Sequence, residues 1–245
     1  MQAMQDKIDG ISNNMSNAET DGYKKVDVSF SDLVYEQLER KGYATNKNGV
    51  NQHLTGSGVK AEEWLRNNTQ GPLKATDIDT DFAIDGQGFF KVTTNDGNAA
   101  YIRAGSFKLD SQGQLTDSNG NRLEVLYSGN EKALTKGNFS VNEAGEITNI
   151  STKQIIGKIN LYKSVGDDSM YSVGDSLYMP KAGTQVTTVN VKDANIRQGF
   201  VEASNVDLGT EMTDLIITQR AFELNSKSLS TVDQMMGIIN NLRSK

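Results

Sequence analysis

The residues whose types could support chemistry are few and scattered in this sequence. His53 is the only histidine, and it sits in a polar, glycine-dotted stretch beside Gln52 and Thr55. A catalytic or metal-binding histidine needs partner groups at a set geometry, and nothing in the sequence pairs with this one. The chain has no cysteine, which removes disulfides, thiolate zinc sites and thiol nucleophiles. We therefore expect no catalytic residue, no metal site and no cofactor.

An acidic stretch resembles a calcium-binding loop at first sight. Its carboxylates belong to Asp77, Asp79, Asp81 and Asp85. An EF-hand loop needs glycine at its sixth position and a bidentate glutamate at its twelfth. Counted from Asp77, those positions hold Phe82 and Gly88, so the match fails.

The run GQGFF, residues 86–90, contains the glycines of a phosphate-binding loop. It lacks the GxxxxGK[ST] pattern and the following helix, and it precedes a β-type run. No GxSxG pattern supports a serine nucleophile either. We interpret GQGFF as a turn whose aromatic residues enter a core, and a hydrolase is the weakest of the functions considered.

Composition excludes several classes of partner. The formal net charge is −6, so there is no basic field to neutralise nucleic-acid phosphates, and we expect no nucleic-acid partner. Because no catalytic set of residues is found, we also expect no small-molecule substrate. No apolar run approaches the roughly 20 residues that cross a bilayer. The N-terminal MQAMQDKIDG lacks the basic start and apolar run of a cleaved signal peptide.

The two ends of the chain have helical periodicity. Near the N-terminus apolar residues recur every three or four positions, which predicts an amphipathic helix ending before Asp21-Gly22. Near the C-terminus an apolar residue recurs every seven positions from about Asn205 to Leu242, which predicts a helix about 50 Å long. We expect these stripes to form a self-assembly seam: Met4, Ile8, Ile11, Met15, Leu208, Met212, Leu215, Phe222, Leu229, Val232, Met236 and Ile239.

Between the helices, glycine-rich turns separate short runs of β-branched and aromatic residues, a pattern typical of antiparallel strands. The predicted fold class is α+β, mainly β, with an antiparallel β domain inserted between N- and C-terminal coiled-coil helices. Trp64 and Leu65 are expected to anchor an extended arm onto the β domain. The expected divisions are 1–35 (helix and exit), 36–71 (arm or loop), 72–200 (β domain) and 201–245 (helix).

Several segments resemble the flagellar basal-body rod and hook family. The similarity begins at ISNNMSNAETDGYKK, residues 11–25, and returns at TDFAIDGQGFFKV, YIRAGSFKLDSQGQL and VGDSLYMP. It is strongest in residues 198–236, where TQRAFELNSKSLSTVDQM is most similar to members that build the distal rod. Family members usually carry about another helical turn before the stretch matched by MQAMQDKIDG, so a shortened N-terminal helix is expected.

The resemblance implies a structural rod subunit of the basal body that polymerises helically and transmits torque from motor to hook. It implies three partners: further copies, neighbouring rod and hook proteins, and the flagellar type III export apparatus, which needs no cleaved signal peptide. Phe30 and Val34 fit the family's short export-gate pattern. A proximal rod or hook subunit and a secreted β-domain binding module remain alternatives.

Overall fold

The computed structural model describes residues 1–32, 36–37, 54–55, 59–128, 134–164, 170–174, 176–181, 183–189 and 193–243. The chain divides into two compact units. The helical unit comprises Met1–Asn14, Val26–Leu65 and Gly209–Lys245, and the β unit comprises Met15–Lys25 and Arg66–Leu208. Both units are therefore assembled from segments that are far apart in the sequence.

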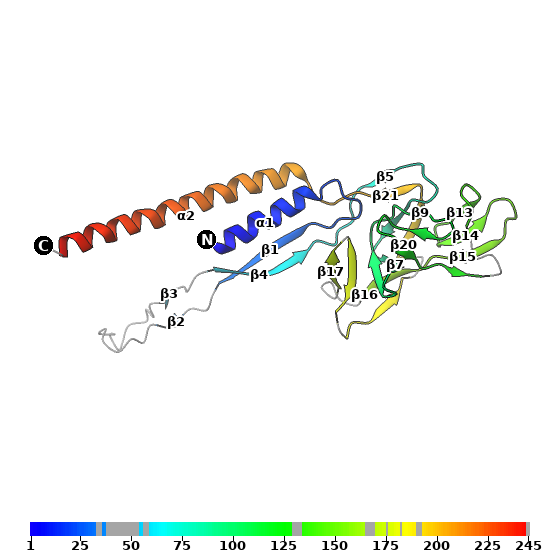
Figure 1. The fold of residues 1–245 in the computed structure, drawn as a ribbon, viewed down its shortest axis with the longest axis horizontal. Coiled ribbons are helices and arrows are strands. Elements are labelled where there is room, and N and C mark those ends of the chain that lie inside the picture. The colour runs from blue at the N-terminus through cyan, green and yellow to red at the C-terminus, as the bar shows by residue number, and fades with distance from the viewer. Residues whose placement is uncertain are drawn as a thin grey trace. The chain divides into compact units, whose positions relative to one another are not determined.

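The helical unit contains most of two helices and a ribbon of strands (Figure 1). Strand β1 pairs with β4, and β2 pairs with β3. The elements are α1 (Gln2–Ser16), β1 (Val26–Asp32), β2 (Glu36–Gln37), β3 (Leu54–Thr55), β4 (Val59–Arg66) and α2 (Leu208–Arg243). The two predicted terminal helices are confirmed, with bounds within a few residues of those expected.

Helix α1 packs closely on the ribbon because of a glycine. A Cβ atom on Gly10 would lie 3.1 Å from Val28 Cγ2 and 3.2 Å from Trp64 Cζ3. Trp64 thus lies beside α1 within the helical unit, and the prediction that it anchors an arm onto the β domain is wrong. The prediction failed because β4 continues through Trp64 and pairs with β1, a strand that is distant in the sequence.

Helix α2 has 36 residues, about 54 Å at 1.5 Å per residue. Every side chain from Glu223 to Leu242 is exposed. Within the described part of the chain, neither helix has an apolar stretch that would span a membrane.

The β unit is built from antiparallel pairings of short strands. One sheet follows the order β17-β18-β8-β7-β11-β10-β9, with β16 joining β7 and β19; a second follows β12-β15-β14-β13; β20-β6 and β21-β5 are separate pairs. The strand bounds are β5 (Leu73–Ala75), β6 (Phe82–Gly86), β7 (Phe89–Thr93), β8 (Ala99–Ile102), β9 (Lys108–Leu109), β10 (Leu115–Thr116), β11 (Arg122–Leu123), β12 (Leu126–Tyr127), β13 (Phe139–Val141), β14 (Glu146–Asn149), β15 (Ile155–Lys158), β16 (Leu161–Ser164), β17 (Met170–Gly174), β18 (Leu177–Pro180), β19 (Val186–Thr188), β20 (Ala194–Gln198) and β21 (Phe200–Glu202).

One hydrophobic core unites these sheets. Phe90 and Phe107 meet edge to face with ring centroids 5.7 Å apart, and Phe82 lies 6.2 Å from Phe107. The cluster extends through Leu115, Phe139, Ile147 and Ile159 and into Ile196. Phe90 is fully buried, which confirms that GQGFF sends an aromatic residue into a core.

Short acidic turns join the small strands. The Asp110 carboxylate accepts from the amides of Gln112 and Gln114, each at 2.8 Å, and Asp117 likewise accepts from Asn119 and Asn121. Such turns satisfy their own backbone groups, so strands of two residues suffice between them. The mainly β, α+β fold class with one helix near each terminus is confirmed.

Limited proteolysis should separate the stable from the labile parts of the chain. In a dilute monomer, trypsin should cleave after Lys227 on exposed α2 well before it cleaves after Arg103, which is buried in the β unit. Mass spectrometry of a digestion time course gives the order of cleavage. Early cuts within the described β strands, with α2 intact, would contradict this assignment.

Candidate functional site

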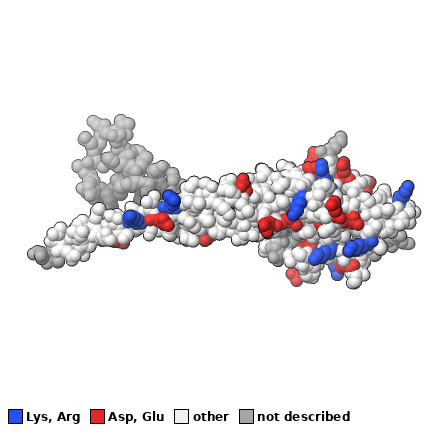
Figure 2. All heavy atoms as spheres, turned by 90° about the horizontal axis from the view of Figure 1, so that it is seen from above, with Lys and Arg blue, Asp and Glu red and all other residues white. Residues whose placement is uncertain are grey.

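The exposed side of α2 carries a long series of large apolar side chains. Their exposed fractions run from 49% for Val232 to 73% for Leu242. Figure 2 shows few charged side chains on this helix in the face drawn, whereas charges are dense over the β unit. Monomeric soluble proteins rarely expose so many large apolar side chains on one element, and such surfaces usually bind another chain. The exposed residues are Met212, Ile216, Ile217, Leu224, Leu229, Val232, Met235, Met236, Ile238, Ile239 and Leu242.

The first turns of α2 have one face that is already covered. Glu211 and Thr218 are buried, and Leu215 and Phe222 are half-buried. These four residues follow one another at steps of four, three and four, so they share one side of the helix. The covered face therefore stops near Phe222, while the apolar residues continue for about another 20 residues, or 30 Å.

Asn14 connects three elements of the helical unit. Its side-chain amide donates to the Val26 carbonyl at 3.0 Å and to Glu211 Oε2 at 3.1 Å, and its Oδ1 accepts from the Val26 amide at 2.9 Å. Asn14 is 1% exposed, and unmade hydrogen bonds cost most in such a dry setting. The amide thus positions the start of α2 against α1 and β1, which lie next to each other in Figure 1.

A buried ionic cluster organises the β unit. Glu202 accepts from Lys24 Nζ at 2.6 Å through Oε1 and from Arg103 Nε at 2.5 Å through Oε2. None of the three residues is more than 4% exposed. Burial lowers the pKa of Lys24, although its hydrogen bond to Glu202 acts in the opposite direction. The cluster joins the segment after α1 and the segment before α2 to strand β8 and its continuation.

Backbone carbonyls balance the excess positive charge of this cluster, which has two cations and one carboxylate. Arg103 donates to the carbonyls of Gly88 at 2.6 Å, Gly86 at 2.8 Å and Ile84 at 3.1 Å. Lys24 donates to the Thr69 carbonyl at 2.7 Å. The GQG stretch therefore turns its carbonyl oxygens toward a guanidinium, the opposite polarity to the amides of a phosphate loop.

Gly22 packs the segment after α1 closely on two other segments of the β unit, at Ala104 and Glu202. Its amide donates to the Glu202 carbonyl at 2.7 Å. Its φ is 69°, and a Cβ atom there would lie 2.5 Å from the Ala104 amide nitrogen. A larger residue would therefore be strained in its backbone and would collide with the neighbouring chain.

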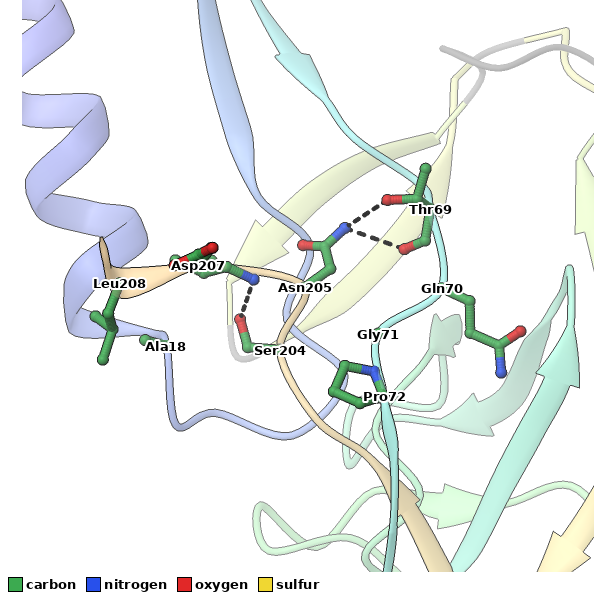
Figure 3. Close-up of a pocket in the computed structure, with 10 residues that line it drawn as sticks. Ala18, Thr69, Gln70, Gly71, Pro72, Ser204, Asn205, Asp207 and Leu208 are labelled. Carbon is green, nitrogen blue, oxygen red and sulfur yellow. Dashed lines mark hydrogen bonds between the residues drawn. The ribbon is translucent and has the colours of Figure 1, made fainter. Parts of the chain in front are cut away.

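Asn205 holds the end of the same segment, at Lys25, beside the chain around Asn67 and Thr69. Its Oδ1 accepts from the Lys25 amide at 2.7 Å, and its Nδ2 donates to the carbonyls of Asn67 and Thr69 at 2.9 and 3.0 Å. Figure 3 shows the bonds to Thr69 beside an open depression of about 520 Å³. The depression is lined by Ala18, Thr69, Gln70, Gly71, Pro72, Ser204, Asn205, Val206, Asp207 and Leu208.

The structure distributes the predicted seam residues unequally. On α1, Ile11 is buried, and Met4, Ile8 and Met15 are half-buried. On α2, Leu215 and Phe222 are half-buried, whereas the others are exposed: Leu208, Met212, Leu229, Val232, Met236 and Ile239. Whether these residues act as one assembly seam stays a prediction.

Of the remaining candidate residues, one lies in a described strand and two lie outside the described residues. Phe30 lies in strand β1, while Val34 and His53 lie outside the described residues. Among the residues that the structure describes, no three histidine, aspartate or glutamate side chains gather as metal ligands would.

Sequence reasoning missed the polar residues that position the helices. Asn14, Lys24 and Glu202 all lie inside segments that carried the family resemblance, but periodicity treats them as surface positions. Arg103 is a basic residue next to an otherwise apolar β run. It was the one sequence signal of a buried charge, and a buried charge needs a partner.

Comparison with known proteins places this architecture in a family. Residues 197–242 match the family described as "Flagellar basal body rod FlgEFG protein C-terminal", and residues 83–126 match "Flagellar hook protein FlgE/F/G D1 domain". The flagellar basal-body rod protein FlgG of Borreliella burgdorferi is 33% identical over 255 residues, which cover 99% of this chain and 95% of that protein. This chain belongs to the flagellar basal-body rod protein family.

Other relatives support the same assignment. FlgG of Buchnera aphidicola subsp. Acyrthosiphon pisum is 36% identical over 96% of this chain and 94% of its own length. The flagellar hook-basal body complex protein FlhP of Bacillus subtilis is 31% identical over 98% of this chain and 95% of its own length. The family resemblance inferred from the sequence is confirmed, and the matched C-terminal region contains nearly all of α2.

Removing the central carboxylate should destabilise the rod-family β unit strongly. Glu202→Ala leaves Lys24 and Arg103 buried without their carboxylate, which should lower the free energy of unfolding by about 3–5 kcal/mol. Urea unfolding followed by circular dichroism measures the loss. The matched control is Glu124→Ala, which breaks the more exposed pair with Lys91 and should cost less than about 1 kcal/mol. Equal losses in both variants would exclude a special role for the buried cluster.

Proposed function

We propose that this protein is a structural subunit of the bacterial flagellar rod, most similar in role to the distal rod subunit; the FlgG relatives support this role. Copies would polymerise helically into a shaft that transmits torque from motor to hook. The observation that carries the proposed polymerisation is α2, a 36-residue helix whose large apolar side chains are exposed beyond Phe222. Burying them between copies would supply about 25 cal/mol per Å² of apolar surface at every repeat.

The terminal helices would form the axial, coiled-coil part of the assembly, and the inserted β domain would lie outside them. We retain the division into residues 1–35, 36–71, 72–200 and 201–245 as part of this proposal. The seven-residue spacing on α2 supports it, because that spacing suits helices that wind around one another. Asn14 supports it as well, since its hydrogen bonds hold the start of α2 beside α1.

The proposed partners are further copies of this chain, neighbouring rod and hook proteins, and the flagellar type III export apparatus. The proposed location is the basal body. A shaft needs interfaces that resist shear, and we propose that the subunit acts without catalysis, cofactor, nucleic acid or small-molecule substrate.

A proximal rod or hook position is the second candidate. It is supported by the match of residues 83–126 to a description shared by FlgE, FlgF and FlgG. The similarity to FlhP supports it as well. Binding of the purified chain to each of the neighbouring rod and hook subunits would show its position along the axis.

Substitution of the seven-residue row tests the assembly proposal. Leu215→Ser with Phe222→Ser should abolish polymerisation and motility, because both side chains lie on the seven-residue row that we propose packs against other helices. The core of the β unit contains neither residue, so the unit should still unfold cooperatively. Electron microscopy of the purified chain measures filament formation. Ser230→Ala with Gln234→Ala, on the polar side of α2, is the matched control and should assemble normally; normal filaments from the first variant would contradict the proposal.

A second substitution tests export. Phe30 lies in β1 of the folded chain, but an unfolded export substrate could present its ring and Val34 together to an apolar groove. Phe30→Ala should reduce secreted protein relative to cytoplasmic protein by about tenfold, the loss expected when an apolar anchor worth about 1.4 kcal/mol is removed. Secretion and the stability of the purified variant are measured side by side. Normal secretion with impaired assembly would make Phe30 a packing residue only.

A further inference from the structure

The exposed thioether groups of this chain are concentrated on α2. The chain contains eight methionines and no cysteine, so thioethers are its only sulfur groups. On α2, Met212, Met235 and Met236 are 50%, 57% and 63% exposed. Met1 is exposed as well, and the remaining four are half-buried: Met4, Met15, Met170 and Met179. The helix on which the assembly proposal rests therefore carries most of the sulfur that solvent reaches.

Met235 and Met236 belong to one small apolar patch. Val232 and Ile239 each lie three or four positions from both methionines, so the four residues are neighbours on one side of the helix. Every member of this methionine patch is at least 49% exposed. Half of its large apolar side chains are thus thioethers.

Met212 lies at the edge of the covered face in the first turns of α2. Leu215, three positions further on, is half-buried. Ile216, four positions further on, is 54% exposed. The Met212 side chain is therefore beside packed residues but remains open to solvent.

Exposed thioethers react with hydrogen peroxide. The sulfur lone pair attacks one peroxide oxygen, an S–O bond forms and the O–O bond breaks. The sulfur is oxidised by two electrons, the peroxide is reduced, and its second oxygen leaves as water. The product is methionine sulfoxide, a polar group that disrupts methionine-rich contact surfaces and that thiol-dependent methionine sulfoxide reductases convert back.

The methionines of the β unit are placed differently. Met179 packs against the hydrophobic core. Its sulfur also accepts a hydrogen bond from the Tyr171 hydroxyl at 3.9 Å. Packing limits the approach of peroxide, and the hydrogen bond engages the lone pair that would attack it. Oxidation should therefore be selective for α2.

We propose that Met212, Met235 and Met236 are oxidation sites through which hydrogen peroxide blocks assembly of the free subunit. Sulfoxides at positions 235 and 236 would put two polar oxygens into the methionine patch, and burying them without hydrogen-bond donors is unfavourable. A patch already covered by a neighbouring copy is closed to the oxidant, so peroxide acts before assembly and spares the finished polymer. This inference rests on the proposed function and adds a chemical regulation of the same surface.

The reactive sites can be mapped on the full-length chain. The protein is treated with hydrogen peroxide, the oxidant is removed with catalase, and tryptic peptides are quantified by mass spectrometry over time. Met235 and Met236 leave on the peptide of residues 228–243, in which fragmentation separates them. The three α2 methionines should oxidise several-fold faster than Met15 and Met179.

Assembly of the treated protein is followed by light scattering and electron microscopy. Oxidation should raise the concentration needed for assembly at least about tenfold, which corresponds to about 1.4 kcal/mol. The triple variant Met212→Leu, Met235→Leu, Met236→Leu should assemble equally well before and after peroxide, because leucine keeps the apolar volume without the sulfur. Met170→Leu with Met179→Leu is the matched control and should lose assembly after peroxide as the unsubstituted chain does.

Three results would overturn this inference and leave the proposed function intact. One is oxidation of the α2 methionines no faster than that of Met15 and Met179. Another is normal assembly of the chain oxidised at all three sites. The third is a triple leucine variant that peroxide inhibits as strongly as the unsubstituted chain, since oxidation would then act elsewhere. An untreated chain that never assembles would overturn the proposed function and the effect on assembly, while the oxidation rates would still decide whether these methionines are the reactive sites.

Discussion

The Glu202 carboxylate lies between Lys24 and Arg103, and this contact holds together three segments of the β unit that are far apart in the sequence. Lys24 follows α1, Glu202 precedes α2, and Arg103 follows strand β8. Three segments separated by many residues are therefore held by one buried group. Because an unpaired charge at this depth would be costly, the three side chains are stable only together.

The chemistry of the two cations explains why one is arginine and the other lysine. The planar guanidinium of Arg103 reaches Glu202 and three carbonyls at once, which suits a curved strand-to-strand segment rich in glycine. Lys24 is a compact charge with fewer, more adaptable donors, and it contacts one carbonyl and the carboxylate. A lysine at position 103 could not satisfy the carbonyls of Ile84, Gly86 and Gly88 in the same way.

Stability is distributed unevenly between the two units. The β unit has one continuous hydrophobic core and a satisfied ionic cluster. Every side chain of α2 from Glu223 to Leu242 is exposed, and a helix with an unburied apolar face gains little from propensity alone. Local opening of the chain should therefore begin in α2 while the β unit stays folded.

The sequence by itself determined the elements with strong local periodicity. The stripe from Met4 to Met15 and the seven-residue row from Leu208 to Met236 were sufficient to predict α1 and α2. The glycine turns were sufficient to predict a mainly β interior. The quoted segments were also sufficient to identify the family, because similarity in order along the chain does not depend on knowing any contact.

Only the tertiary structure decided which polar residues are buried and which apolar residues are not. Asn14 and Glu211 are 197 residues apart, and Glu202 and Lys24 are 178 residues apart. No local sequence signal could pair residues at such separations. Trp64 was assigned to the wrong unit because its strand partner, β1, is distant in sequence. The exposed side chains of Ile217, Leu224 and Ile238 were not part of the predicted seam, because Thr231 interrupts their seven-residue spacing. Periodicity reports the neighbours of a residue along one element, whereas burial is set by contacts between elements that only the folded chain brings together.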